Sequence, residues 1–220
     1  MKSIKTRIGV IGITMVALAS WAVAADLTDI ALPTPRIEGG KPLMQTLKER
    51  QSARAFSTKT LPVQVVSDLL WAAFGINRPD PGKRTAPSAM NWQEVGVYVI
   101  MKDGAYFYDA KANSLRPVAK GDLRKLTGTQ EFVATAPLNL VYVADIRRMK
   151  GATPDNQVFY SGTDVGFISQ NVYLFCASEG LATVVRGSID RDDLAKALNL
   201  SEQKRIILAQ TVGYPGTEPR

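Results

Sequence analysis

The sequence predicts an α+β domain in which helices flank a mostly antiparallel central sheet. Three observations support this fold class. Apolar, β-branched runs of strand length recur between residues 95 and 214, and Asp103-Gly104 between two of them is a typical hairpin turn pair. Residues 63–74 and 164–179 carry apolar positions at helical spacing. The chain has 220 residues, 45% hydrophobic and 21% charged, with no internal repeat, as expected for one globular domain.

The elements are expected in the following order. Residues 26–42 contain three prolines and Gly39-Gly40, which favours an extended arm, and the domain then runs over residues 43–220. Residues 76–92 are rich in proline and polar residues, which predicts a long loop of the kind that is usually functional or disordered. Helices are predicted at 43–50, 63–74, 164–179 and 190–198, short helical segments at 121–126 and 131–135, and strands at 95–101, 106–108, 115–118, 138–144, 181–186 and 206–214.

The first 25 residues have the order of a secretory signal peptide. Lys2, Lys5 and Arg7 precede 18 uncharged residues, and small residues close that run before Asp26. Cleavage after Ala24 or Ala25 would send the protein to the periplasm or outside the cell, with no stable membrane insertion afterwards. The alternative is an uncleaved membrane anchor formed by residues 8–25, although a spanning helix usually needs about 20 residues.

Composition excludes several classes of function. The chain has no histidine and one cysteine, Cys176, so no intramolecular disulfide, zinc site or histidine-based general acid-base mechanism is expected. Without the first 25 residues the net charge is +4, and the cations are scattered. Such a balance does not favour nucleic acid as a partner. Cys176 lies in the apolar helix, where core packing is its expected role.

The segment from Arg50 to Arg54 is the first candidate binding site. Two guanidinium groups and the Ser52 hydroxyl follow a predicted helix within five residues. Arginine binds phosphate through two parallel hydrogen bonds and stays charged at any working pH, so this spacing suits one phosphate group. The alternative is two surface arginines and a capping serine.

Two further segments are candidates for contact with a planar ligand. Residues 86–93 combine small side chains, which allow close approach to the backbone, with the amides of Asn91 and Gln93. The alternative is a polar turn before a strand. Residues 162–166 are expected to enter the long helix and to present free N–H groups to an electron-rich ring or an anion. The alternative is that they supply only an N-cap through Thr163 or Asp164.

The ordered set of motifs resembles the nitroreductase family of flavin enzymes over about residues 43–215. The motifs are Arg50-x-Ser52-x-Arg54-x-Phe56, Ala86-Pro87-Ser88-Ala89-x-Asn91-x-Gln93, Ala136-Pro137, Asp164-Val165-Gly166 with Gln170-Asn171, Gly180-Leu181 and Val212-Gly213-Tyr214-Pro215. Residues 103–109, Leu115 and residues 121–124 are similar to the SagB-type dehydrogenase branch. Relatives often have a basic residue at Gln51 and proline with an aromatic residue from Glu94 onward, and this chain departs at both points.

The resemblance implies FMN bound without a covalent bond at the interface of a homodimer. Arg50, Ser52 and Arg54 would hold the phosphate and ribityl chain, and Arg220 is the one basic residue left to help them after the last strand. The flavin ring would lie against a second set of positions, and the backbone of Val165 and Gly166 would lie near its N5 atom. These positions are Pro87, Ser88, Asn91, Gln93, Val165 and Gly166.

Two functions follow as expectations. The first is an exported FMN-dependent oxidoreductase that passes electrons through flavin N5, in two half-reactions at one site, to a nitroaromatic, quinone or similar electron-poor compound. NAD(P)H would be a candidate donor, although it is scarce outside the cytoplasm. The second is a non-catalytic protein of the same fold that binds flavin or a related ring in the periplasm.

Overall fold

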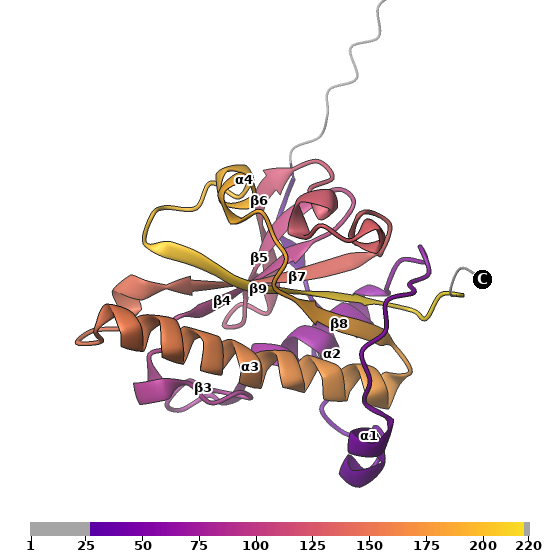
Figure 1. Cartoon of the computed structure of the whole chain (residues 1–220). Helices are drawn as coiled ribbons and strands as arrows, with labels where there is room; N and C mark the ends of the chain where they lie inside the picture. Colours follow the sequence, from indigo (N-terminus) through magenta and orange to yellow (C-terminus); the bar gives the residue numbers. More distant parts are fainter. Residues whose placement is uncertain (1–26, 218–220) are drawn as a thin grey trace, which may run out of the picture.

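The computed structural model describes residues 27–217, so the predicted signal peptide and Arg220 lie outside the described residues. A seven-stranded sheet forms the centre of the molecule, with strand order β1-β6-β5-β4-β7-β9-β8 (Figure 1). Every pair of neighbouring strands in this sheet is antiparallel. The described residues therefore confirm the predicted α+β class with an antiparallel sheet.

The elements have the following bounds. The helices are α1 (Leu43–Glu49), α2 (Val63–Phe74), α3 (Pro154–Glu179) and α4 (Arg191–Ala197). The strands of the main sheet are β1 (Ile30–Ala31), β4 (Val95–Ile100), β5 (Gly104–Asp109), β6 (Ser114–Lys120), β7 (Leu138–Asp145), β8 (Ala182–Arg186) and β9 (Lys204–Gly213). Short 3-10 helices occupy Ala89–Asn91, Arg124–Thr127, Glu131–Ala134 and Ile146–Arg148.

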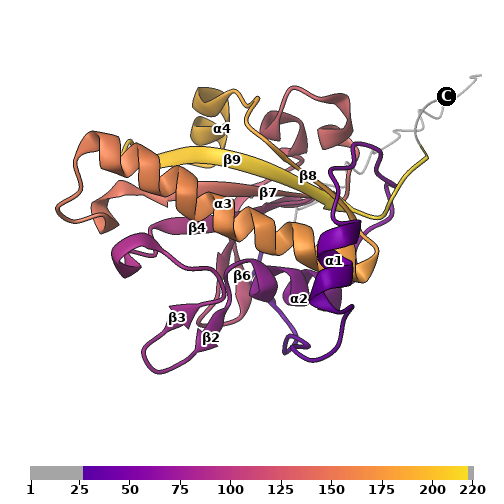
Figure 2. The ribbon, with the colours of Figure 1, turned by 60° about the horizontal axis from the view of Figure 1, so that its bottom comes forward.

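Both faces of the sheet are covered. Helices α2 and α3 lie across one face, whereas α4 lies on the other, as the two views of the ribbon show (Figures 1 and 2). Successive residues of β7 alternate between the two cores: Leu140 and Tyr142 pack with α2 and α3, and Val141 packs with Leu194 of α4. Because each strand residue is buried on one side or the other, β7 is almost entirely apolar, as its sequence predicted.

The N-terminal arm remains extended and is tied to the domain along its length. Strand β1 pairs with β6 and forms that edge of the sheet, with Ile30 opposite Leu115. Farther along, the Arg36 guanidinium lies 2.7 Å from the Asp68 carboxylate of α2. The arm is thus part of the domain's surface rather than a free linker.

Two expectations about local structure are corrected. The predicted loop 76–92 contains a small antiparallel hairpin, β2 (Ile76–Arg78) and β3 (Lys83–Arg84), because residues 79–82 form a tight turn between them. Helix α3 begins at Pro154, ten residues before the predicted start. Pro154 takes the first helical position and Thr153 accepts from the Asn156 N–H, which together are the N-terminal signal that the sequence reading passed over.

The remaining boundaries agree closely with the sequence. Helix α2 has the predicted bounds, and Gly180 caps α3 in the left-handed conformation with φ of 70°. Cys176 is fully buried in the core beside α2 and the sheet. Within residues 27–217, no helix is both long and apolar enough to cross a membrane.

Candidate active site

The arginine segment follows directly from the end of α1. Arg50 is the C-terminal cap of that helix, with ψ of 122°, and the chain then becomes extended. It runs along the free edge of β8, where the Ala53 N–H donates to the Thr183 carbonyl at 2.9 Å. This contact fixes Ser52 and Arg54 on either side of an anchored residue.

Tyr173 of α3 organises the segment, and the sequence reading missed it. The Arg50 guanidinium lies over its ring, 5.3 Å from the centroid. Its hydroxyl is 2.8 Å from the Ser52 hydroxyl and accepts from the Val185 N–H at 3.0 Å. Tyr173 is 7% exposed, and it lies two helical turns after Val165 on the buried side of α3. The sequence offered one signal for this role: a tyrosine stands among the buried apolar residues of α3, and the hydroxyl of a buried tyrosine needs a hydrogen-bond partner.

The charges of this segment are uncompensated. Arg54 is exposed, Arg50 is half-buried, and neither forms an ion pair within residues 27–217. Their guanidinium donors and the Ser52 hydroxyl are the groups that bind a phosphate monoester most effectively. The donor set therefore fits the phosphate end of a mononucleotide such as FMN.

The second candidate segment is a tight loop before β4. Met90, Asn91 and Gln93 have φ values of 49°, 54° and 48°, in the left-handed region that non-glycine residues rarely adopt. Pro87 and Asn91 are exposed, whereas Ser88 is half-buried and accepts from the Gln93 N–H at 2.8 Å. The loop thus presents its outer residues while its inner hydrogen bonds hold the shape.

The side chain of Gln93 is engaged inside the loop. Its amide oxygen accepts from Arg84 Nε at 3.0 Å, and its amide nitrogen donates to Asn91 Oδ1 and to the Gly82 carbonyl, each at 3.1 Å. With its amide committed to these partners, Gln93 orients Asn91 and joins the loop to the β2–β3 hairpin.

The expectation for residues 162–166 is corrected. These residues lie in the middle of α3, so their N–H groups are bonded within the helix and no free helix start exists there. Val165 is fully buried, whereas Gly166 is exposed. A Cβ atom at Gly166 would meet nothing within 4 Å, so this residue leaves a bare strip of backbone at the surface of α3.

The structure brings together two carboxyl groups that sequence spacing did not connect. Glu94 and Asp164 are each 2% exposed. Asp164 Oδ2 accepts from the Ala89 N–H at 2.9 Å, and Glu94 Oε2 accepts from the Ser88 hydroxyl at 3.3 Å. Burial, reinforced by the charge of Asp164, raises the pKa of Glu94 to about 7. Seventy positions separate the two residues in the chain, so only the packing of α3 on the loop unites them.

The two candidate segments lie at different places along one helix. The arginine segment contacts Tyr173 and the loop contacts Asp164, which are nine residues apart. At 1.5 Å per residue this separation is about 13 Å along α3. One chain therefore offers an anion-binding group and a partly exposed loop at two separate points along the same helix.

Comparison with known proteins identifies the family. The sequence model described as "Nitroreductase family" matches residues 47–214. The chain belongs to the nitroreductase family. Its antiparallel sheet with flanking helices is accordingly a nitroreductase-like fold. Membership indicates an oxidoreductase, and members of the family generally bind FMN.

Individual relatives cover nearly the whole domain. A crystal structure from Ralstonia eutropha JMP134 is 42% identical, covers 87% of this chain and 91% of its own, and superposes with a TM-score of 0.83. A protein of Methanocaldococcus jannaschii is 29% identical over 193 aligned residues, and the match covers 83% of this chain and 96% of that one. Both are named "putative nitroreductase". The E. coli microcin synthetase McbBCD complex, at 19% identity, 96% and 85% coverage and a TM-score of 0.67, shows similarity of fold alone.

Proposed function

We propose that the protein is an exported FMN-dependent oxidoreductase that reduces a nitroaromatic, quinone or similar electron-poor compound. The observation that carries the proposal is the pair of arginines, Arg50 and Arg54, without a carboxylate partner in residues 27–217 and with Ser52 held between them. Family membership adds the expectation of a flavin.

The residues have distinct roles in this proposal. When bound, FMN supplies hydride acceptance and donation at N5, so no protein nucleophile or histidine is required. Arg50 and Arg54 bind the phosphate, and Ser52, fixed by Tyr173, binds the adjoining ribityl chain. Pro87, Ser88 and Asn91 line the ring, and the bare backbone near Gly166 lets the ring approach α3.

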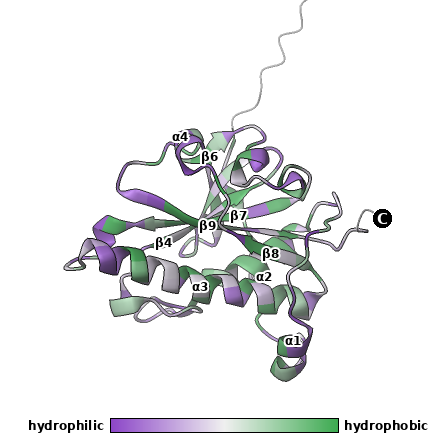
Figure 3. Ribbon diagram, in the orientation of Figure 1, coloured by the Kyte–Doolittle hydropathy of each residue, from purple (hydrophilic) through white to green (hydrophobic). Residues whose placement is uncertain are grey.

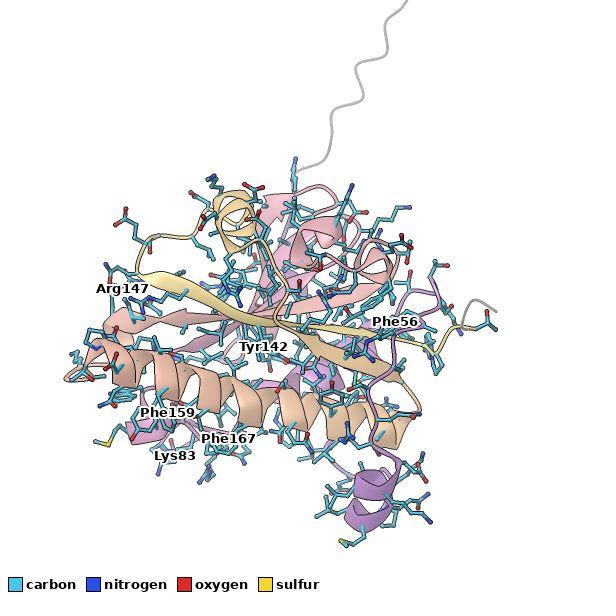
Figure 4. The ribbon with its side chains drawn as sticks, viewed as in Figure 1. Phe56, Lys83, Tyr142, Arg147, Phe159 and Phe167 are labelled. Carbon is cyan, nitrogen blue, oxygen red and sulfur yellow. The ribbon has the colours of Figure 1, made fainter. Side chains whose placement is uncertain are left out.

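A homodimer would complete the site. Several large apolar side chains are exposed on α1 and α3 and in the loop; they are Leu43, Met44, Leu47, Met90, Val158, Phe159 and Phe167. Phe159 and Phe167 project from the side of α3 away from the sheet (Figure 4), and α3 carries both hydrophobic and hydrophilic segments along its length (Figure 3). A second copy on this face would bury these side chains. It would also allow the arginine segment of one subunit to face the ring-binding loop of the other.

Export rests on the first 25 residues. Cleavage after Ala24 or Ala25 predicts a mature periplasmic or secreted chain, and the mass of the protein purified from a periplasmic fraction tests this directly. Retention of residues 8–25 in a membrane fraction would favour the anchor instead. We also propose that the chain belongs to the SagB-type branch, because residues 103–109, Leu115 and residues 121–124 resemble it.

The visible spectrum of the purified protein tests the function. The protein should be yellow, should release FMN on acid denaturation, and should be bleached by NADH or NADPH and re-oxidised by a quinone. The double variant Arg50→Gln, Arg54→Gln should lose most of its FMN affinity, whereas Arg191→Gln, far from the site, should not. A colourless protein that ignores added FMN refutes the proposal. Flavin that only dithionite reduces would favour the non-catalytic flavin-binding protein.

A further inference from the structure

The loop of residues 87–93, called the ring-binding loop after its role in the proposed function, is held in a conformation that its own sequence does not favour. Three of its non-glycine residues have positive φ, and such residues persist only where surrounding contacts outweigh the strain. One of those contacts comes from α3, where Asp164 Oδ2 accepts from the Ala89 N–H. Another comes from the Ser88 hydroxyl, which joins the Gln93 N–H to Glu94. These two hydrogen bonds anchor the loop, and their acceptors are the carboxyl groups of Asp164 and Glu94.

Glu94 is poorly compensated as an anion. Its Oε1 atom accepts no hydrogen bond from any residue in the described part of the chain, although the atom is fully buried. After burial, the neighbouring carboxyl of Asp164 also raises the pKa of Glu94, through its charge and through hydrogen bonding between the two groups. Two carboxyl groups can share a hydrogen bond only if one of them keeps a proton.

Other charged and titratable groups line the same cavity as Glu94 but have partners of their own. A cavity of about 160 Å³ borders Glu94, and the groups around it come from β3, β4, β7, β9 and the 3-10 helix after β7. Each has another partner: Arg84 bonds Gln93 and the Phe74 carbonyl, Arg148 bonds the Trp92 carbonyl, Lys204 bonds the Tyr98 hydroxyl, and Asp145 bonds Arg147. No cation among them donates to Glu94, so burial dominates and favours the neutral carboxyl.

We infer that Glu94 and Asp164 share one proton and act as a positioning pair that holds the ring-binding loop against α3. Loss of the proton would leave two adjacent buried carboxylates beneath residues 88–93. Their repulsion would push the two carboxylates apart and displace the acceptors that Ala89 and Ser88 bond, and the strained loop would then relax. Ring binding would consequently be linked to uptake of one proton, and this consequence rests on the proposed function. The raised pKa of Glu94, about 7, places the transition near neutral pH.

Trp92 can report on the loop without any flavin. It ends the 3-10 helix of the loop, and its ring packs edge-on against Tyr160 of α3, with centroids 5.8 Å apart. In the full chain with Trp21→Phe and Trp71→Phe, Trp92 fluorescence should titrate with one midpoint near pH 7. The transition should vanish in Glu94→Gln. In Asp164→Asn the midpoint should move to lower pH, because the neighbouring negative charge is gone.

A control variant and a second measurement keep the test decisive. Glu131→Gln, an exposed carboxyl remote from the loop, should leave the transition unchanged. A transition that persists in Glu94→Gln, an unchanged midpoint in Asp164→Asn, or no transition between about pH 5 and 9 overturns the inference. Infrared difference spectra should show a protonated-carboxyl band at pH 6 in the parent protein and no such band in Glu94→Gln. If the band persists in Glu94→Gln, the inference that Glu94 and Asp164 share a proton is wrong.

The linkage to the ring is measured separately. The dissociation constant of FMN, followed by quenching of its fluorescence, should rise up to tenfold per pH unit above the midpoint and stay flat in Glu94→Gln. A pH-independent constant in the wild type refutes the linkage. Absence of FMN binding at every pH refutes the proposed function, while the Trp92 titration still tests the proton-sharing pair.

Discussion

Replacing Tyr173 by phenylalanine tests how the arginine segment is supported. The change keeps the ring that Arg50 lies over but removes the hydroxyl that bonds Ser52 and accepts from the Val185 N–H. Val185 is half-buried, so leaving its N–H without a partner should cost about 1–2 kcal/mol. The lost hydrogen bond to Ser52 adds about 0.5–1 kcal/mol. We expect Tyr173→Phe to lower the free energy of unfolding by about 2 kcal/mol in total.

Thermal and urea denaturation at a fixed protein concentration measure this loss. For a chain of this size, about 2 kcal/mol corresponds to a fall in Tm of about 4–8 °C. The matched control is Ser52→Ala, which removes only the exposed partner and should cost no more than about 1 kcal/mol. If Tyr173→Phe is no more damaging than Ser52→Ala, the Val185 N–H does not depend on Tyr173 and the reasoning is wrong.

Three further predictions concern stability and assembly. The pKa of Glu94 is raised from 4.5 to about 7, so the stability from its neutral form is complete below pH 4.5 and lost as pH rises through 7. Urea unfolding should show a loss of at most about 3 kcal/mol between pH 5 and 8.5 that Glu94→Gln does not show. Arg186, 6% exposed, donates to Thr127 and Asn139, so Arg186→Met should cost about 3 kcal/mol, and a loss below about 1 kcal/mol would contradict its structural role. Phe167→Glu should give a folded monomer by light scattering and circular dichroism, and an unchanged dimer would exclude this face as the interface.

The pattern of the chain was enough to place most elements. The apolar spacing of residues 63–74 gave α2 its bounds, and the unbroken apolar run at 138–144 predicted a strand covered on both faces. Both rest on local periodicity, which depends on which side of an element faces a core. The predicted start of α3 was wrong because the first turns of the helix carry few buried residues, and there the cap at Thr153 and the proline at 154 mark the helix.

The candidate site was predictable in its residues but not in its support. Arg50, Ser52 and Arg54 stand within five positions of the chain, so their common chemistry is visible in sequence. Tyr173, which holds Arg50 and Ser52 in place, is 121 positions beyond Ser52. A contact of that kind arises only when α3 packs beside the edge of β8.

The sequence by itself determined which segments are strands and helices, because side-chain period and turn residues are local properties. It also supplied the phosphate-binding chemistry, because guanidinium charge does not depend on the fold. Tertiary structure alone decided that Glu94 meets Asp164 and that no cation within residues 27–217 pairs with Glu94. The electrostatics of that pair depend on burial and on distances between segments far apart in the chain, which periodicity cannot report.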